Sequence, residues 1–309
     1  MYEASLRVNM PEHRAGLLAE LLTACDLRGV LSHGSQQLPR YVHEIRDKGI
    51  NPDPNVQIIK DTSNTLTLDG DGGLGYYPAY EGTQRLMEKA REHGMAMLVT
   101  RNHGHIGAAG IYTRLAAEHG LAAFATSGVQ MRLRPEHSVF AAAPSPPMSF
   151  SLPAGEEPPL VLDANVTHWL DYTKHDDDPR LKRRLMQVVL RMIGMGTVCQ
   201  AWGGLLTGLP ADAERAVRTY RNAHQGALLF MFDPGLFIEP DRLGREMDEF
   251  AQRMRQLKPI EGSEGAFLPG HVESEREKKY RREGIPLSET HYRDMEILAA
   301  SLGLTPPWD

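Results

Sequence analysis

Two histidines lie two residues apart inside a glycine-rich turn, in the segment VTRNHGHIGAAGIY at residues 99–112. His103 and His105 could bind a metal, since imidazoles at this spacing on an extended segment can face the same way, but the third ligand would be His33 or His168 only if the fold brings one of them close. The glycines let the backbone approach a ligand, yet their spacing is not a dinucleotide fingerprint, which makes them a weak phosphate signal. Histidine is also the commonest general acid or base at neutral pH. A structural alternative is that both rings only cap the next helix or lie in solvent.

Two other short segments could likewise have either a functional or a purely structural role. Ser32–Gly34 (SHG) follows a predicted helix and is either part of a catalytic site or a helix-terminating turn. Asp69–Gly75 (DGDGGLG) looks like a calcium loop at first sight, but it lacks the bidentate glutamate that such a loop needs. Its composition predicts a hairpin turn instead. The sequence therefore assigns no metal site.

The overall composition excludes several classes of protein. Of the 309 residues, 41% are hydrophobic and 24% charged, which is typical of a globular protein with a real core. The formal net charge of −6 does not attract a polyanion, so we expect no nucleic-acid partner. The N-terminus has no apolar signal region and no 18-residue apolar run is present, which predicts a protein outside the membrane. The two cysteines, Cys25 and Cys199, form no motif, and this suits the cytoplasm.

Hydrophobic periodicity predicts the elements that must position the histidines. Helices and strands alternate along the chain, which favours an α/β or α+β layer structure. The pattern predicts helices over 10–30, 79–94, 109–120, 175–208 and 240–258, strands over 95–102, 121–128, 160–166 and 226–233, a hairpin within 56–75 and a helical hairpin over 267–304. Gly194 and Gly196 are expected to break the long helix. The prolines of residues 141–159 exclude a central strand there.

Several of these segments, taken in order, resemble the malate/L-lactate dehydrogenase family. They are DLRGVLSHGSQQLPRYV, LDGDGGLGYYPA, TRNHGHIGAAGIY, LPAGEEPPLVLD, GGLLTG, GALLFMFDPGLF and LPGHVESEREKKYRREGIPL. The resemblance implies a non-Rossmann, largely antiparallel sheet flanked by helices. It implies a helical substrate and dimer domain at 1–60 plus 265–309, and a cofactor-binding sheet domain at 61–264 with a shortened insertion around 168–202. It also implies a homodimer with the active site near the subunit interface, and hydride transfer between NAD or NADP and a small 2-hydroxy, 2-oxo or imino acid.

The resemblance also assigns site residues. The catalytic histidine of the family falls on His105, and the histidine of its Ser-His-Gly motif falls on His33. The arginine that anchors the substrate carboxylate in the family is replaced by Gln37, and a neutral amide cannot make the bidentate contact of a guanidinium. Gln37 and Arg40 are the predicted substrate contacts. Asp163, Ala164 and Asn165 are the predicted cofactor contacts.

Two further departures from the family fall on the cofactor site. PSPP (Pro144–Pro147) replaces a Gly-Thr-Asn-Pro turn, and LRMIG (Leu190–Gly194) replaces the His-Lys-Gly-Tyr-Gly cofactor loop. The sequence therefore leaves two other hypotheses beside the dehydrogenase. One is a nicotinamide-independent lyase, hydrolase or isomerase, built on His33, His103 and His105 with Asp163, His168 or Asp171. The other is a catalytically silent interaction protein.

The hypotheses differ in what they predict about the structure. A dehydrogenase requires a cleft of dinucleotide size beside residues 160–165. A nicotinamide-independent enzyme predicts a cleft that Pro144–Pro147 and the helix from Arg180 fill. It also predicts His103 within about 4 Å of His105 or His33, or a metal at roughly 2.0–2.1 Å from imidazole nitrogens. A silent protein predicts histidines that point apart, with no enclosed pocket.

Overall fold

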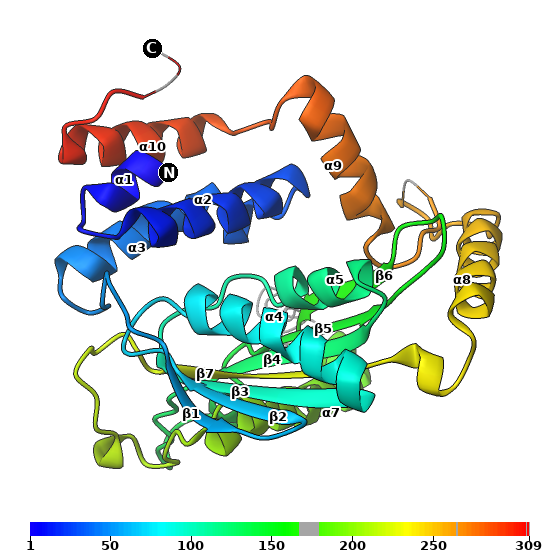
Figure 1. Cartoon of the computed structure of the whole chain (residues 1–309), viewed down its shortest axis with the longest axis horizontal. Coiled ribbons are helices and arrows are strands. Elements are labelled where there is room, and N and C mark those ends of the chain that lie inside the picture. Colours follow the sequence, from blue (N-terminus) through cyan, green and yellow to red (C-terminus); the bar gives the residue numbers. More distant parts are fainter. Residues whose placement is uncertain (167–178, 264, 307, 309) are drawn as a thin grey trace.

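A seven-stranded sheet forms the centre of the chain (Figure 1), in the order β1-β2-β3-β7-β4-β5-β6. The computed structural model describes residues 1–166, 179–263, 265–306 and 308. The strands are β1 (Gln57–Asp61), β2 (Thr65–Asp69), β3 (Met95–His103), β4 (Ala122–Val129), β5 (Pro147–Leu152), β6 (Leu160–Asn165) and β7 (Gln225–Phe232). Every neighbouring pair is antiparallel except β2 and β3, which α4 connects. The predicted α/β fold with a largely antiparallel sheet is confirmed.

Helices cover the sheet in layers (Figure 1). The helices are α1 (Tyr2–Leu6), α2 (Glu12–Leu27), α3 (Leu38–Arg46), α4 (Tyr76–His93), α5 (Gly110–Glu118), α7 (Pro179–Gly203), α8 (Pro240–Arg255), α9 (His271–Glu283) and α10 (Glu289–Leu302). Helices α4 and α5 lie on one face of the sheet and α7 on the other, while α1, α2, α3 and α10 form an outer layer beyond α4. The division into two domains stays a prediction.

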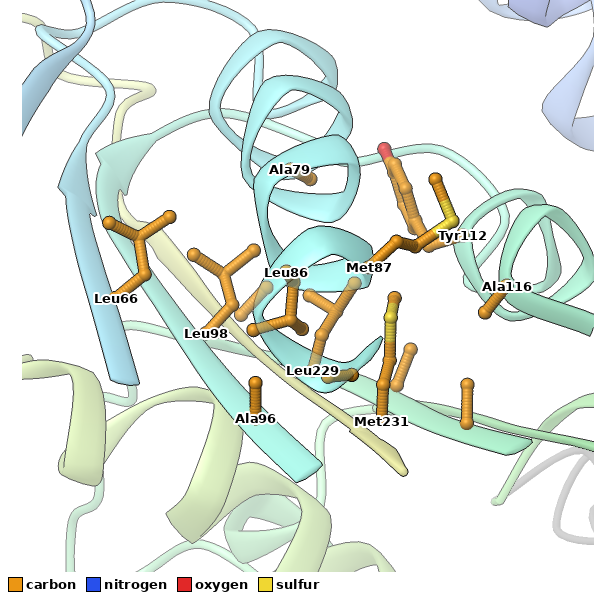
Figure 2. Close-up of a cluster of buried hydrophobic side chains, with 14 of the residues drawn as sticks. Leu66, Ala79, Leu86, Met87, Ala96, Leu98, Tyr112, Ala116, Leu229 and Met231 are labelled. Carbon is orange, nitrogen blue, oxygen red and sulfur yellow. The ribbon is translucent and has the colours of Figure 1, made fainter. Parts of the chain in front are cut away.

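The main core lies between the sheet and helices α4 and α5 (Figure 2). Strand residues such as Leu66, Leu98 and Leu229 point toward Leu86 of α4 and Tyr112 of α5. Alternate strand residues share one face of a sheet, and burial alternates along residues 65–69 and 95–100, so every second side chain of these strands lies on the face that the helices cover. This core fixes the end of β3 and the start of α5, the two elements that flank the histidine turn.

The prediction that prolines exclude a central strand from 141–159 was wrong. Strand β5 pairs with β4 on one side and β6 on the other. Pro147 is its first residue, and the residues from Met148 to Leu152 carry the backbone N–H groups that the ladder needs. The prolines therefore mark the entrance of the strand rather than its absence.

Two other connections also differ from the prediction. Asp69–Gly75 is not a hairpin turn, because it links β2 to α4 and its backbone bonds to the end of β3, as in Gly72 N–H to the carbonyl of Asn102. The last two helices form as predicted, and Ser288 caps the second one by accepting from the His291 N–H. They do not pack as a hairpin: α9 contacts α2, whereas α10 contacts α3 (Figure 1).

Helix α7 runs through Gly194 without a break, contrary to prediction, because a single glycine costs only about 1 kcal/mol in a helix that tertiary contacts hold. Its last residue, Gly203, has a different role. A Cβ at Gly203 would lie 2.3 Å from the carbonyl carbon of Ser127 and 2.5 Å from the nitrogen of Gly128. The helix therefore approaches β4 backbone to backbone, and neither side can yield by rotating a side chain.

A matched pair of alanine variants tests this contact. Gly203→Ala should lower the free energy of unfolding by about 2 kcal/mol, because overpacking against a fixed backbone costs about 1–3 kcal/mol. Gly194→Ala, where a Cβ meets nothing within 4 Å, should raise it by about 0.5–1 kcal/mol. Urea unfolding of both variants measures the difference, and equal effects would contradict the close approach.

Candidate active site

The turn after β3 directs His105 toward α3, where it meets a tyrosine. The hydroxyl of Tyr41 lies 2.6 Å from His105 Nδ1 and 3.2 Å from the hydroxyl of Tyr76. Burial is the main cause that lowers the pKa of His105 to about 3, and the charges of His33, Arg40 and His103 lower it further. His105 is therefore neutral at pH 7. In the tautomer in which Nδ1–H donates to the Tyr41 hydroxyl, Nε2 carries no hydrogen and is the ring nitrogen that acts as a base.

His103 points the other way and is completely buried. Burial lowers its pKa to about 4, so the ring is neutral. Its Nδ1 lies 2.7 Å from the Gly104 carbonyl, which can only accept, and its Nε2 lies 2.8 Å from Thr100 Oγ1. Nδ1–H therefore donates to Gly104, and Nε2 accepts from Thr100. The close approach of the 69–75 segment, where a Cβ on Gly70 would lie 2.8 Å from His103 Cβ, completes its enclosure.

His33 reaches His105 from the turn between α2 and α3. The two ring centroids lie 5.6 Å apart, and Ser32 Oγ lies 3.1 Å from His33 Nδ1. The turn is tied down behind His33, where the backbone N–H of Ser35 donates to the buried carboxylate of Asp26 at 3.0 and 3.1 Å. The structure thus brings His33 and His105 together and leaves His103 out of the pair.

A cavity of about 540 Å³ opens beside this histidine pair. One wall is the end of β6, formed by Asp163, Ala164 and Asn165. The other lining residues belong to the turns and strands around it and to α7; they include Ser32, Ser127, Pro144–Pro147, Met192, Gln200 and Gln225. The cleft expected beside residues 160–165 is therefore present, and Pro144–Pro147 line it rather than fill it.

Asp163 forms the boundary of the cavity toward α5. Its carboxylate accepts from the backbone N–H of Gly110, and a Cβ on Gly110 would lie 2.6 Å from Asp163 Oδ2, so glycine leaves the space that the carboxylate occupies. Burial raises the pKa of Asp163 to about 6, although the Gly110 N–H and the charge of Arg114 act in the opposite direction. A polar group in a ligand could bind this carboxylate.

The two predicted substrate contacts lie away from this cavity. Gln37 Nε2 donates to the Ser32 carbonyl at 2.6 Å and so holds the turn that carries His33. Arg40 forms an ion pair with Glu44 at 2.8 Å and lines a separate cavity between α3 and α10. Its charge still acts on His105 by disfavouring the protonated ring. Among the described lining residues of the main cavity, no arginine or lysine is present.

Sequence reasoning missed Tyr41, although it lies one helical turn after Gln37 in a helix whose other apolar residues are buried. A tyrosine in such a stripe is ordinarily core, and only the path of the histidine turn brings its hydroxyl to His105. Of the alternative residues, His168 and Asp171 lie outside the described residues. Within the part of the chain that the structure describes, no three His, Cys, Asp or Glu side chains are grouped so that they could hold a metal ion.

Comparison with known proteins places this arrangement in context. A family model described as malate/L-lactate dehydrogenase matches residues 1–169 and 191–296. The chain is 32% identical to a malate dehydrogenase of Pyrococcus horikoshii over 155 residues, which are 50% of this chain and 43% of that protein. It is 24% identical to an L-sulfolactate dehydrogenase of Methanocaldococcus jannaschii over 96% of this chain and 93% of that one. The solved structure of the P. horikoshii enzyme superposes with a TM-score of 0.80 over 98% of this chain and 93% of that chain, at 20% identity.

Proposed function

The chain belongs to the malate/L-lactate dehydrogenase family, and from this premise we propose that it is an oxidoreductase acting on a small 2-hydroxy, 2-oxo or imino acid with a nicotinamide cofactor. The observation that carries the proposal is the cavity that a half-buried, neutral histidine and the end of β6 line together. Ligand pockets of about 300–1,000 Å³ take molecules of this size. The lining mixes polar serine, glutamine and asparagine side chains with proline and alanine. Such a lining suits a ligand that has a flat ring and polar groups at the edge of that ring.

Asp163, Ala164 and Asn165 would hold the cofactor along the β6 wall. When bound there, a nicotinamide supplies the acceptor or donor of the hydride. The role of the protein is to move the proton: in the oxidation of a hydroxy acid, His105 Nε2 takes the hydroxyl proton while the carbon-bound hydrogen leaves as hydride. Tyr41 holds the ring in place through Nδ1. In the reverse direction, His105 returns the proton to the carbonyl oxygen or imine nitrogen.

The family resemblance makes a carboxylate the expected anchor of the substrate, but the described lining of this cavity contains no arginine that would bind it. Ser32, Asn165 and His33 are the groups that we propose in its place, through neutral hydrogen bonds and the ring of His33. Each of these is a weaker partner than a bidentate guanidinium. A substrate with a further polar group, which Ser127 or Gln225 could bind, is therefore favoured over a bare 2-hydroxy acid.

Titration with NADH and NADPH tests the proposal directly. We expect dissociation constants in the micromolar range by fluorescence or calorimetry, and loss of binding in Ala164→Trp, which introduces an indole at the cavity wall. Ala211→Trp, on an exposed loop, is the matched control and should bind like the parent. Absence of binding up to millimolar concentrations would contradict the proposal and favour a nicotinamide-independent enzyme. A screen of 2-oxo and 2-imino acids follows a positive result.

We further propose that the chain forms a homodimer through α7, rather than through the helical domain at 1–60 plus 265–309 that the resemblance implies. Apolar side chains of this helix are exposed, including Leu190 at 55% and Trp202 at 48%. The segment Met186–Thr207 is long and apolar enough by composition to cross a membrane. One face of α7, however, packs against β4 and β7 of the sheet. We therefore propose that a second copy of the chain, rather than a membrane, covers the exposed apolar face. Since Met192 of the same helix lines the main cavity, such an interface would lie beside the site. The cytoplasmic location stays a prediction.

A charge in this face should dissociate the dimer. We expect sedimentation of the parent protein at about twice the chain mass of 34.4 kDa, and a shift toward one chain in Leu190→Asp, because a buried unpaired carboxylate disfavours the interface. Val217→Asp places the same charge on a side chain that is 99% exposed and should leave the mass unchanged. A parent protein that sediments as one chain would contradict the proposal.

A further inference from the structure

A buried polar contact joins the last helix of the chain to the turn that carries His33. The Nε2 atom of His291, in the first turn of α10, lies 2.9 Å from the hydroxyl of Ser35, which is two residues after His33. Asp26, near the end of α2, accepts from both the hydroxyl and the backbone N–H of Ser35. All three side chains of this network, from Asp26, Ser35 and His291, are buried. Three segments far apart in the sequence therefore meet at one hydroxyl group.

The carboxylate of Asp26 sets the direction of these hydrogen bonds. Both of its oxygens lie within 3.1 Å of the Ser35 backbone nitrogen, which suits an ionised carboxylate that can only accept. Burial raises the pKa of Asp26, whereas the hydrogen bonds from Ser35 lower it. The Ser35 hydroxyl thus donates to Asp26, and its oxygen accepts from His291 Nε2–H. In this tautomer His291 Nδ1 carries only a lone pair, and Nδ1 is the ring atom without a hydrogen-bond partner among the described residues.

Apolar contacts already hold α10 against its neighbours. Leu298 of α10 belongs to the same buried cluster as Leu22 of α2 and Val42 of α3. Replacing a buried hydrogen-bonded pair by apolar groups of the same shape is often nearly neutral for a fold. A hydrogen-bond network adds direction, because it fixes one arrangement of the groups that it joins. The group that needs such fixing is the turn, whose short 3₁₀ segments, Leu31–His33 and Ser35–Gln37, have poorer hydrogen-bond geometry than an α-helix.

The anchored part of the turn lies directly beside His33. A Cβ on Gly34 would lie 1.8 Å from Asp26 Oδ1, so glycine lets the backbone come close to the carboxylate. His33 itself lines the main cavity, with its ring centroid 5.6 Å from that of His105. One residue therefore separates the His33 backbone from the Ser35 anchor, and a shift of this anchor is passed on to the ring in the cavity.

We propose that His291 is a positioning residue, which acts through Ser35 to hold the His33 ring in the main cavity, where it contacts the substrate carboxylate. This inference rests on the proposed function for the reaction, in which His33 is a substrate contact, whereas the position of the ring can be measured without it. Because the predicted cofactor contacts lie on β6, the network should govern the binding of the acid and leave the binding of the nicotinamide nucleotide unchanged.

Steady-state kinetics with the best acid from the screen tests this role. His291→Leu keeps an apolar side chain in place but removes the donor, and it should raise the KM for the acid by about tenfold while kcat changes by less than about threefold. His291→Gln, whose amide N–H can still donate to Ser35, should recover most of this loss. Ser35→Ala should match His291→Leu, and the double variant should be no worse than either, because both changes break the same chain of hydrogen bonds. His13→Leu, at an exposed histidine of α2, is the matched control and should keep the parent KM.

The NMR signal of the His33 ring provides a readout that needs no turnover. In protein that contains ¹³C-labelled histidine, the Cε1–Hε1 signal of His33 is assigned by its loss in His33→Gln. We expect this signal to shift in His291→Leu and in Ser35→Ala, and to keep its position in His13→Leu. A His33 signal that stays in place in both Ser35→Ala and His291→Leu would overturn the inference, and Ser35→Ala decides alone if His291→Leu does not fold.

The melting temperature separates positioning from a purely structural role. A lower melting temperature in His291→Leu, with the KM and the His33 signal unchanged, would show that His291 only supports the fold and would overturn the inference. A KM raised by about a hundredfold in the double variant would also overturn it, because the two residues would then act separately. A shifted His33 signal in a protein that oxidises no acid and binds no nicotinamide nucleotide would support the placement of the ring by His291 and contradict the proposed function.

Discussion

His105→Gln is expected to lower the rate of hydride transfer by about 10²–10⁴-fold, which is the range that a general acid or base contributes. Glutamine keeps a polar side chain of similar length, but it cannot exchange a proton with the substrate. Because Tyr41 holds Nδ1 at 2.6 Å, the parent ring presents Nε2 to the cavity in a fixed orientation. The measurement is the rate of NADPH or NADH oxidation with the best acid from the 2-oxo and 2-imino screen.

Cofactor titration of the same variant distinguishes loss of chemistry from loss of binding. We expect the affinity for the nicotinamide nucleotide to change by less than about threefold, since the predicted cofactor contacts lie on β6. His13→Gln, an exposed histidine on α2, is the control and should keep the parent rate. A His105→Gln protein that retains more than about a tenth of the parent rate would contradict the role of this residue as acid or base.

Acidification should destabilise the protein through His103 and His105 before most carboxylates titrate. Their pKa values are lowered from 6.5 to about 4 for His103 and about 3 for His105. In the unfolded chain both rings bind a proton as the pH falls below 6.5, whereas in the folded protein they stay neutral. The stability that they contribute is therefore present above pH 6.5 and lost as the pH falls toward 4. At pH 5 the loss is about 2 kcal/mol for each ring.

Urea unfolding at pH 7.5 and pH 5 measures this loss, and a His103→Gln variant isolates one ring. The variant should be less stable at pH 7.5, because Thr100 and the Gly104 carbonyl lose partners, but its stability should fall by about 2 kcal/mol less on acidification. The pKa of Asp163 is raised to about 6, so protonation of Asp163 stabilises the folded state as the pH falls. This contribution is the same in the parent and in His103→Gln and therefore cancels when the two are compared. His13→Gln should keep the pH dependence of the parent, and an equal pH dependence in His103→Gln would contradict the assignment.

Most of the fold was predictable from local patterns. The apolar spacing of residues 12–27 and 76–93 and the alternation of residues 65–69 place each element on the correct side of a core, because burial is decided face by face along the element. Local patterns gave the wrong prediction where contacts with a neighbouring strand or with the sheet determined the secondary structure. Strand β5 forms beside three prolines because β4 and β6 offer it partners, and α7 continues through Gly194 because the sheet supports it.

The sequence by itself determined the fold class, the family resemblance, and the identity of His33, His105 and Asp163–Asn165 as residues worth testing. The resemblance singled out His105, but only the tertiary structure shows how the surroundings of the two histidines differ. His103 and His105 are equivalent in composition and spacing, yet the turn after β3 sends one ring into the loop beneath it and the other toward Tyr41. Tertiary structure also buried Arg114 of α5 beside Asp163 of β6, a neighbour that its position in the helix does not predict. The physical reason is the same in both cases: the solvation and partners of a side chain depend on segments distant in sequence, which no local pattern contains.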